Sequence, residues 1–362
     1  MIKLLIVDDS PLMRRLLVDI FTDAGDFEVE VARSGAEALQ RLAAFAPDVI
    51  TLDIHMPGMD GLACLDRIMI ERPCPVVMVS SLTAEGADVT LQAIELGAVD
   101  FIAKPRGALS LEIDSVVPAL LEKVRTAAAV RISRATRLRE RVQASTRAKP
   151  RTVASITPAV VRRNATTGPI PANGLVLVGC STGGPPALDA VLGGLPADFP
   201  WPVLVAQHMP ATFTGPLARR LDKMCALTVS EVTRSTPLEP GNVYIGRGDA
   251  DLIVTRRGGS LAAAAAPSSA DHFWHPSVDR MVQSAMAHLS PDQLVGVLMT
   301  GMGNDGAAAL TELKTRGGTT LAESSDTAVV WGMPGALVAA EGASIVAPLE
   351  SLAAELVALF AR

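Results

Sequence analysis

The chain of 362 residues lacks any long run of apolar residues, although 49% of its residues are hydrophobic. No stretch approaches the roughly 18 consecutive apolar residues of a membrane-spanning helix. The N-terminus, Met1-Ile2-Lys3-Leu4-Leu5, leads straight into a strand pattern and lacks the basic, apolar and small-residue regions of a signal peptide. We therefore expect a cytoplasmic protein that is not integral to a membrane.

Cysteine is also scarce. The four cysteines, Cys64, Cys74, Cys180 and Cys225, show no C-x-x-C spacing and lie in apolar surroundings. Structural zinc sites and disulfide frameworks need closely spaced or numerous cysteines. We expect reduced thiols and neither a zinc site nor a disulfide.

Positive charge is concentrated in one segment. The net charge is −6, yet 12 Lys and Arg stand against the single acid Glu140 between Lys123 and Arg163. That segment carries about +11 and leaves about −17 for the rest of the chain. We expect a basic linker over residues 126–172, flexible beyond Pro150, that acts as a solvated spacer or meets an acidic partner or an anionic membrane surface.

Apolar runs and helical patterns alternate before this linker, which predicts a five-stranded, doubly wound parallel sheet over residues 1–125. The expected strands are Lys3–Asp8, Glu28–Ala32, Asp48–Asp53, Val76–Ser80 and Asp100–Ile102. The expected helices are Pro11–Ala24, Ala36–Ala46, Gly61–Glu71, Ala84–Leu96 and Leu111–Ala129.

Residues 173–362 predict a second α/β domain, doubly wound and mostly parallel. Its clearest strands are Leu175–Gly179, Val203–Gln207 and Leu294–Thr300, with later strands at Thr319–Ala322 and Ser344–Ala347. A short β insert is expected at Leu227–Val232, Asn242–Ile245 and Leu252–Thr255. Helices are expected after Ser181, Ala211, Ser277, Asp305, Pro334 and Leu349.

Acidic residues lie at the ends of two strands of the first domain. Asp8 and Asp9 come at the end of the first strand, and Asp53 ends the third. Because the carboxyl ends of neighbouring strands meet at one crevice, three carboxylates should lie together and bind Mg²⁺. Ser80 and Lys104, at the ends of the fourth and fifth strands, add a hydroxyl and a positive charge. This set can hold a phosphoryl group, although acids after strands also simply cap helices.

The motifs around these residues occur in a recognisable order. They are Val7-Asp8-Asp9-Ser10, Leu52-Asp53-Ile54-His55-Met56-Pro57-Gly58-Met59-Asp60-Gly61, Val79-Ser80-Ser81 and Lys104-Pro105. This order strongly resembles the receiver domain of two-component response regulators. The resemblance implies that Asp53 accepts a phosphoryl group from a chemotaxis histidine kinase.

The same resemblance assigns the other residues of the receiver. The implied Mg²⁺ ligands are Asp8, Asp9, Asp53 and the backbone carbonyl of His55. Ser80 and Lys104 would contact the phosphoryl group, and Phe101 matches the aromatic position that often responds to activation. His55 departs from the acidic or polar residue common at its position, which a carbonyl ligand tolerates.

The second domain carries a serine, a histidine and an acid after three separate strands. Ser181 lies in Gly179-Cys180-Ser181-Thr182-Gly183-Gly184, His208 follows an apolar run, and Asp305 lies in a glycine-rich turn. A serine hydroxyl needs a nearby base to act as a nucleophile, and a carboxylate can orient that base. The glycines around Met302 would expose backbone N–H groups to an oxyanion.

Each of these features has other readings. Ser-Thr-Gly-Gly is often a phosphate loop or a plain turn, and the surroundings match neither a P-loop nor G-x-S-x-G. His208 alone could be structural, Asp305 could cap its helix, and Cys180 is an alternative nucleophile. His272 and His275 suggest a metal site by spacing, but Pro276 favours a loop.

The order of four motifs resolves the alternatives. Gly179-Cys180-Ser181-Thr182-Gly183-Gly184, Gln207-His208-Met209-Pro210, His275-Pro276-Ser277-Val278-Asp279 and Thr300-Gly301-Met302-Gly303-Asn304-Asp305-Gly306 together resemble the catalytic domain of the chemotaxis protein-glutamate methylesterase (CheB) family. The resemblance implies Ser181 as nucleophile, His208 as base, Asp305 as orienting acid and the Met302 backbone as part of the oxyanion hole. Cys180 stands where the family often has alanine.

This family resemblance also implies the reaction and its partners. We expect hydrolysis of glutamate γ-methyl esters, and deamidation of glutamines, on methyl-accepting chemoreceptors, with no cofactor beyond the receiver's Mg²⁺. The unphosphorylated receiver would cover the catalytic site, and phosphorylation would uncover it. A DNA-binding output is disfavoured because the second domain is acidic and lacks a helix-turn-helix pattern. A non-catalytic scaffold would not need Ser181, His208 and Asp305 together.

Overall fold

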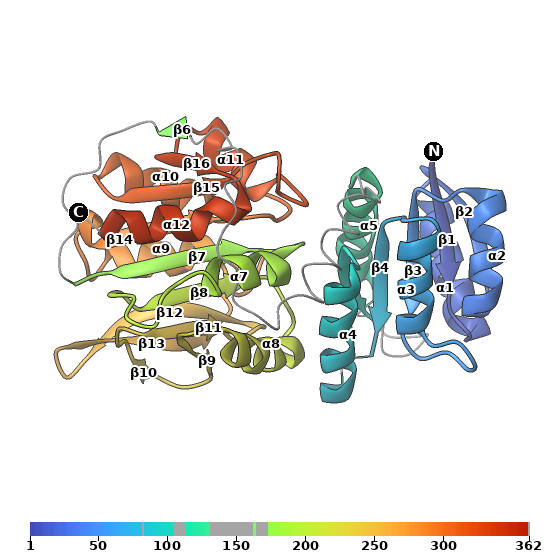
Figure 1. Cartoon of the computed structure of the whole chain (residues 1–362), viewed down its shortest axis with the longest axis horizontal. Coiled ribbons are helices and arrows are strands. Elements are labelled where there is room, and N and C mark those ends of the chain that lie inside the picture. The colour runs from blue at the N-terminus through green and yellow to red at the C-terminus, as the bar shows by residue number, and fades with distance from the viewer. Residues whose placement is uncertain (82, 105–112, 131–161, 164–172, 361–362) are drawn as a thin grey trace. The chain divides into compact units, whose positions relative to one another are not determined.

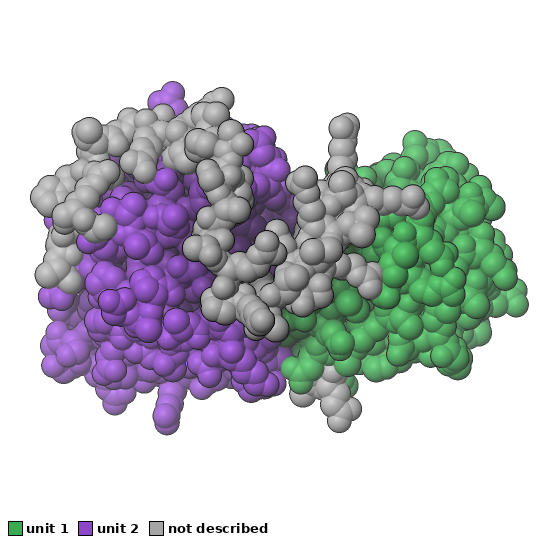
Figure 2. All heavy atoms as spheres, viewed as in Figure 1, with its two compact units in different colours: residues 1–156 green, residues 157–362 purple. Residues whose placement is uncertain are grey.

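The computed structural model describes residues 1–81, 83–104, 113–130, 162–163 and 173–360 (Figure 1). The chain divides into two compact units, residues 1–156 and residues 157–362 (Figure 2). Each unit has its own sheet and its own apolar core.

The first unit has a five-stranded parallel sheet in the order β2-β1-β3-β4-β5. Its strands are β1 (Ile2–Val7), β2 (Phe27–Ala32), β3 (Val49–Asp53), β4 (Val76–Ser80) and β5 (Asp100–Ala103). Its helices are α1 (Pro11–Asp23), α2 (Gly35–Phe45), α3 (Gly61–Glu71), α4 (Ala84–Leu96) and α5 (Ile113–Ala129). The predicted doubly wound sheet is confirmed, with element ends that differ by a few residues at most.

Side chains that precede the helices of this unit explain where those helices begin. Ser10, Ser34, Asp60 and Thr83 each accept a hydrogen bond from a backbone N–H in the first turn of the following helix. Such caps satisfy N–H groups that have no partner within the helix. Every residue of β3 and β4 is buried, as expected for strands covered on both faces.

The second unit has an eight-stranded sheet in the order β6-β16-β15-β14-β7-β8-β11-β9, in which β6 alone is antiparallel to its neighbour. Its strands are β6 (Arg162–Arg163), β7 (Leu175–Cys180), β8 (Val203–Gln207), β9 (Thr228–Val232), β11 (Asn242–Gly246), β14 (Leu294–Leu298), β15 (Thr319–Glu323) and β16 (Ile345–Ala347). A separate antiparallel sheet contains β10 (Thr236–Pro237), β12 (Ala250–Arg257) and β13 (Ser260–Pro267).

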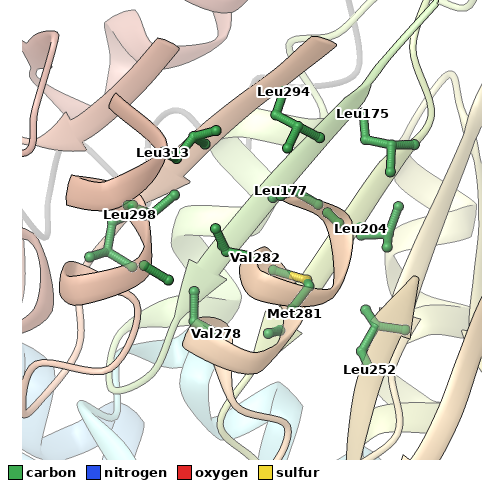
Figure 3. Close-up of a cluster of buried hydrophobic side chains, with 14 of the residues drawn as sticks. Leu175, Leu177, Leu204, Leu252, Val278, Met281, Val282, Leu294, Leu298 and Leu313 are labelled. Carbon is green, nitrogen blue, oxygen red and sulfur yellow. The ribbon is translucent and has the colours of Figure 1, made fainter. Parts of the chain in front are cut away.

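Helices cover both faces of the large sheet (Figure 1). They are α7 (Gly184–Leu192), α8 (Ala211–Met224), α9 (Val278–Met286), α10 (Ala307–Thr315), α11 (Met333–Ala339) and α12 (Leu349–Phe360), with a short 3₁₀ helix at Pro291–Gln293. Figure 3 shows α9 packed on the sheet through Val278, Met281 and Val282. These side chains belong to a buried cluster that also contains Leu177 of β7 and Leu298 of β14. The start of α9 is therefore held close to the central strands.

The structure corrects the predicted β insert. Leu227–Val232 and Asn242–Ile245 correspond to β9 and β11, which extend the large parallel sheet rather than form an insert. Only Leu252–Thr255 lies in the small sheet, within β12, and its partner β13 was not expected. The strand β13 consists largely of alanine, which has a low strand propensity, so its pairing with β12 decides its conformation.

Two further expectations concern the linker and the absence of membrane-spanning helices. Arg162 and Arg163 lie in the segment expected to be a flexible linker, yet they pair with Val346 and Ile345 at the edge of the large sheet. The remainder of that expected linker beyond Val130 lies outside the described residues up to residue 172. Within the described part of the chain, no helix meets the length and hydropathy that a membrane crossing requires.

Candidate active site

Ser181 is the first residue after β7, at the carboxyl end of the large sheet. Its backbone N–H donates to Thr300 O at 2.9 Å, which joins its loop to the loop that follows β14. Gly183 then turns the chain into α7 with φ +77°, a conformation that favours glycine. The serine is thus presented at a sharp strand-to-helix turn.

His208 directly follows β8, the neighbour of β7. Cys180 and Gln207 are register partners, and His208 N donates to Cys180 O at 3.0 Å. Adjacent strands lie about 4.8 Å apart, so Ser181 and His208 leave the sheet side by side. The structure therefore brings the predicted nucleophile and base to one edge.

Asp305 reaches this edge from the loop after β14, on the other side of β7. Its Oδ2 lies 2.8 Å from Nε2 of His208. The other ring nitrogen, Nδ1, is buried and has no hydrogen-bond partner among the described residues. Asp305 thus holds one nitrogen of His208 and leaves Nδ1 available to a hydroxyl.

The start of α9 fixes the carboxylate of Asp305. Its Oδ1 accepts hydrogen bonds from Ser277 Oγ at 3.0 Å and Asp279 N at 3.1 Å, and its Oδ2 accepts one from Val278 N at 2.7 Å. Burial raises the pKa of Asp305, but the hydrogen bonds from His208 and these backbone N–H groups outweigh it, so the pKa is lowered overall. Asp305 is therefore an ionised partner for the imidazole.

Trp274 is a site residue that the sequence analysis missed. Its indole stacks on the ring of His208, with centroids 5.3 Å apart and planes 9° apart. Phe273 meets the same indole edge-on at 4.8 Å and is itself 74% exposed. The signal lay in the segment Phe273-Trp274-His275, which drew attention only for its histidines.

Met302 is buried, and its sulfur lies 3.4 Å from Thr182 Oγ1. Gly301 precedes it, and a Cβ at Gly301 would lie 2.8 Å from Cβ of Ser181. The Met302 backbone is therefore close to the serine. Its role in an oxyanion hole stays a prediction.

A second missed group is the segment Val329–Trp331. Val330 N donates to Thr300 Oγ1 at 3.0 Å, and Gly301 N donates to Val330 O at 3.0 Å. Val329 and Trp331 are 38% and 41% exposed, so apolar side chains border the loops of Ser181 and Met302. Nothing in the local sequence pattern connects this segment to the site.

Gln207 is the third missed residue. Its buried amide Nε2 donates to Ser181 O at 3.0 Å and to His208 O at 3.1 Å, while its Oε1 accepts from Cys180 Sγ at 3.1 Å. A Cβ at Gly184 would overlap this amide, so glycine is required there. One side chain therefore joins the backbones of the nucleophile and the base.

The structure disfavours the alternative roles. Cys180 is fully buried, and burial raises the pKa of its thiol, which leaves it inert as a nucleophile. His275 Nδ1 lies 2.9 Å from Oδ1 of the buried Asp251, which also accepts from Ser277 N at 2.9 Å. Within the described ranges, neither His275 nor His272 belongs to a cluster of metal-ligand residues. Both lie in the loop before α9.

The first unit brings its predicted acids together at the carboxyl ends of β1 and β3. One carboxylate oxygen from each of Asp8, Asp9 and Asp53 lies within 4.8 Å of the others. Oδ2 of Asp8 and Oδ2 of Asp53 are buried, and both face Lys104. Clustered hard oxygen donors of this kind suit Mg²⁺.

Lys104 partly neutralises this cluster. Its Nζ lies 2.8 Å from Asp53 Oδ2 and 3.2 Å from Asp8 Oδ2. Burial nevertheless raises the pKa of Asp53, since Lys104 offsets only part of the desolvation and Asp8 adds repulsion. A further cation would stabilise the ionised form of all three acids.

Ser80, Phe101 and His55 are the remaining predicted residues of the first unit. Ser80 Oγ is buried and accepts from Thr90 Oγ1 of α4 at 2.7 Å. Phe101 is buried, with Lys123 Nζ 5.2 Å from its ring centroid. His55 N donates to Asp53 Oδ1 at 3.2 Å, and its side chain is exposed. The roles assigned to these three residues stay predictions.

Comparisons with known proteins agree across the chain. The family model of the CheB methylesterase matches residues 176–356, and that of the response regulator receiver domain matches residues 4–113. The protein-glutamate methylesterase/protein-glutamine glutaminase 2 of Rhodopseudomonas palustris (strain BisB18) is 56% identical over 99% of this chain and 98% of its own length.

Two further relatives cover all or half of the chain. The protein-glutamate methylesterase/protein-glutamine glutaminase 3 of Rhodospirillum rubrum is 50% identical over 100% of this chain and 97% of its own length. The solved catalytic domain of the CheB methylesterase of Thermotoga maritima is 36% identical with a TM-score of 0.50, and the match covers 52% of this chain and 98% of that domain.

Proposed function

The chain belongs to the CheB methylesterase family, with a response regulator receiver domain, and from this premise we propose that Ser181, His208 and Asp305 hydrolyse glutamate γ-methyl esters on chemoreceptors. The same site would deamidate glutamines there. The observation that carries this proposal is the 2.8 Å contact between His208 and Asp305 at the strand edge where Ser181 emerges.

In the proposed reaction, Ser181 Oγ attacks the ester carbonyl and Nδ1 of His208 takes the hydroxyl proton. Nδ1 is assigned as the base because Nε2 is held by Asp305. The same nitrogen returns the proton to the departing methanol, and water then hydrolyses the acyl-enzyme by the same route. Asp305 keeps the tautomer and offsets the charge of the imidazolium.

The oxyanion of the tetrahedral intermediate would lie beside the Met302 backbone. The turn through Gly301 and Gly303 brings this backbone close to Ser181, and Gly303 has φ +74°. A backbone N–H aimed at developing charge lowers the barrier without reorganisation. This assignment rests on proximity and on the family resemblance.

The receiver would control the esterase through phosphorylation of Asp53 by a histidine kinase. Mg²⁺ would be held by Asp8, Asp9, Asp53 and the His55 carbonyl, and it would neutralise the charge that accumulates on phosphorylation. Lys104 and Ser80 would contact the phosphoryl group. We further propose that the unphosphorylated receiver restricts access to Ser181.

Methanol release from a methylated chemoreceptor tests the proposed reaction. The full chain should release methanol, and Ser181→Ala should abolish the release because it removes the nucleophile. Cys180→Ala is the matched control, since that thiol is buried beside Ser181 and should retain most activity. Equal release by wild type and Ser181→Ala would contradict the proposal.

A further inference from the structure

We propose that Trp274 is a further catalytic residue, whose indole face stabilises the imidazolium that His208 forms during ester hydrolysis. This inference rests on the proposed function and adds a residue to it. It assigns a chemical role to an aromatic side chain that lies outside the serine, histidine and acid motifs.

The indole and the imidazole lie in a parallel, stacked arrangement. The centroids of the Trp274 and His208 rings are 5.3 Å apart and their planes differ by 9°. The electron-rich face of an indole attracts a cation within about 6 Å of the ring centre. Because His208 is buried, little water competes with this attraction.

Trp274 and Asp305 act on the imidazole from different directions. Asp305 meets the ring at Nε2, whereas the indole of Trp274 lies parallel to the ring. The carboxylate fixes the position of Nε2, and the parallel indole restricts rotation of the imidazole out of its plane. Both favour the charged imidazolium over the neutral ring, so their effects on the transition state should reinforce each other.

A buried anchor holds Trp274 in place. The next residue, His275, and the backbone N–H of Ser277 both bind Oδ1 of Asp251 at 2.9 Å. Asp251 is fully buried, and its Oδ2 is paired with Arg280. The stacking position therefore belongs to a fixed segment, although neighbouring Phe273 is exposed.

The loop that follows β14 also lies close to the indole of Trp274. A Cβ at Gly303 would lie 3.6 Å from Nε1 of Trp274, so the indole edge approaches the turn that follows Met302. A merely apolar wall would work equally well with any large side chain. The proposal instead requires the electron density of the indole face, and this difference is measurable.

Progressive fluorination of tryptophan provides the test, because fluorine withdraws electron density from the ring face with little change in size. The full chain would be produced with tryptophan, monofluoro-, difluoro- or trifluorotryptophan. The readout is the rate at which a small fluorophosphonate phosphonylates Ser181, a step in which fluoride leaves and His208 takes the serine proton. The rate should fall with each fluorine, by about threefold to tenfold across the series.

The chain has three tryptophans, so Trp274→Phe serves as the matched control. In this variant only Trp201 and Trp331 carry fluorine, and the rate should not depend on fluorination. A flat series in the wild-type sequence, or an equal slope in Trp274→Phe, would overturn the role of Trp274. Methanol release by unfluorinated wild type is measured in parallel, and its absence would contradict the proposed function instead.

Discussion

Glu323 is a buried acid close to the candidate site. It ends β15, its Oε2 accepts from Thr300 N at 2.8 Å, and its Oε1 accepts from Thr327 Oγ1 at 3.0 Å. Burial raises the pKa of Glu323 to about 7 despite these hydrogen bonds. The residue therefore couples the proton concentration near neutrality to the stability of the second unit.

We expect Glu323→Gln to remove this dependence on pH. In the wild type, the raised pKa gives stability that is fully present below the unfolded value of 4.5 and lost as pH rises through about 7. The free energy of unfolding of the variant, relative to wild type, should thus increase by about 3 kcal/mol between pH 4.5 and pH 8. Urea unfolding at several pH values measures this difference.

Glu312→Gln is the control for that experiment. Glu312 is half exposed and pairs with Arg316 on the surface of α10. Its difference from wild type should stay within about 0.5 kcal/mol across the same range. A Glu323→Gln difference that is equally flat would show that Glu323 is already ionised when buried.

At the scale of elements, the turn between β7 and α7 presents Ser181, and Gly183 lies in this turn. Gly183 is the N-cap of α7 with φ +77°, and a Cβ there would lie 2.8 Å from Cβ of Val329. Gly317 has φ +102°, but a Cβ there would meet nothing within 4 Å among the described residues. The two glycines share a backbone requirement and differ in what they contact.

Gly183→Ala and Gly317→Ala separate backbone strain from displacement of the site. Both should lower the free energy of unfolding by about 1–2 kcal/mol, because alanine is strained at positive φ. Only Gly183→Ala should also lower kcat/KM, by about tenfold or more, since it pushes on Val329 or on the Ser181 turn. Ester hydrolysis kinetics and thermal unfolding, measured on both variants, check this expectation; equal kcat/KM values would exclude it.

The elements that sequence reasoning placed correctly are those whose pattern is local. Continuous apolar runs mark the buried strands of both units. The strand β13 and the positions of β9 and β11 in the large sheet were missed because pairing partners far along the chain decide them. Gln207, Trp274 and Val329 were missed for the same reason, since each reaches the site through contacts between segments far apart in the chain.

At the scale of the whole molecule, the activity of the catalytic unit can be measured with and without the receiver. The catalytic unit has its own sheet and buried core, and a solved relative consists of that domain alone. Residues 173–362 should therefore fold without the receiver. If the receiver restricts access to Ser181, this fragment should hydrolyse the methylated receptor faster than the unphosphorylated full chain.

A small-molecule phosphodonor with Mg²⁺ completes this comparison. The phosphodonor should raise the rate of methanol release by the full chain severalfold. It should not change the rate of the Asp53→Asn variant or of the fragment. Initial rates of methanol release, at equal enzyme concentrations, give the three values. A fragment no faster than the unphosphorylated full chain would rule out inhibition by the receiver.

The contact between Nε2 of His208 and Asp305 has a mechanical consequence. The nitrogen left for catalysis, Nδ1, is bonded to Cγ, the ring carbon attached to Cβ, so it lies nearer the main chain than Nε2 does. The position of the base relative to the nucleophile therefore depends on the main chain at the end of β8, which Gln207 joins to the Ser181 backbone.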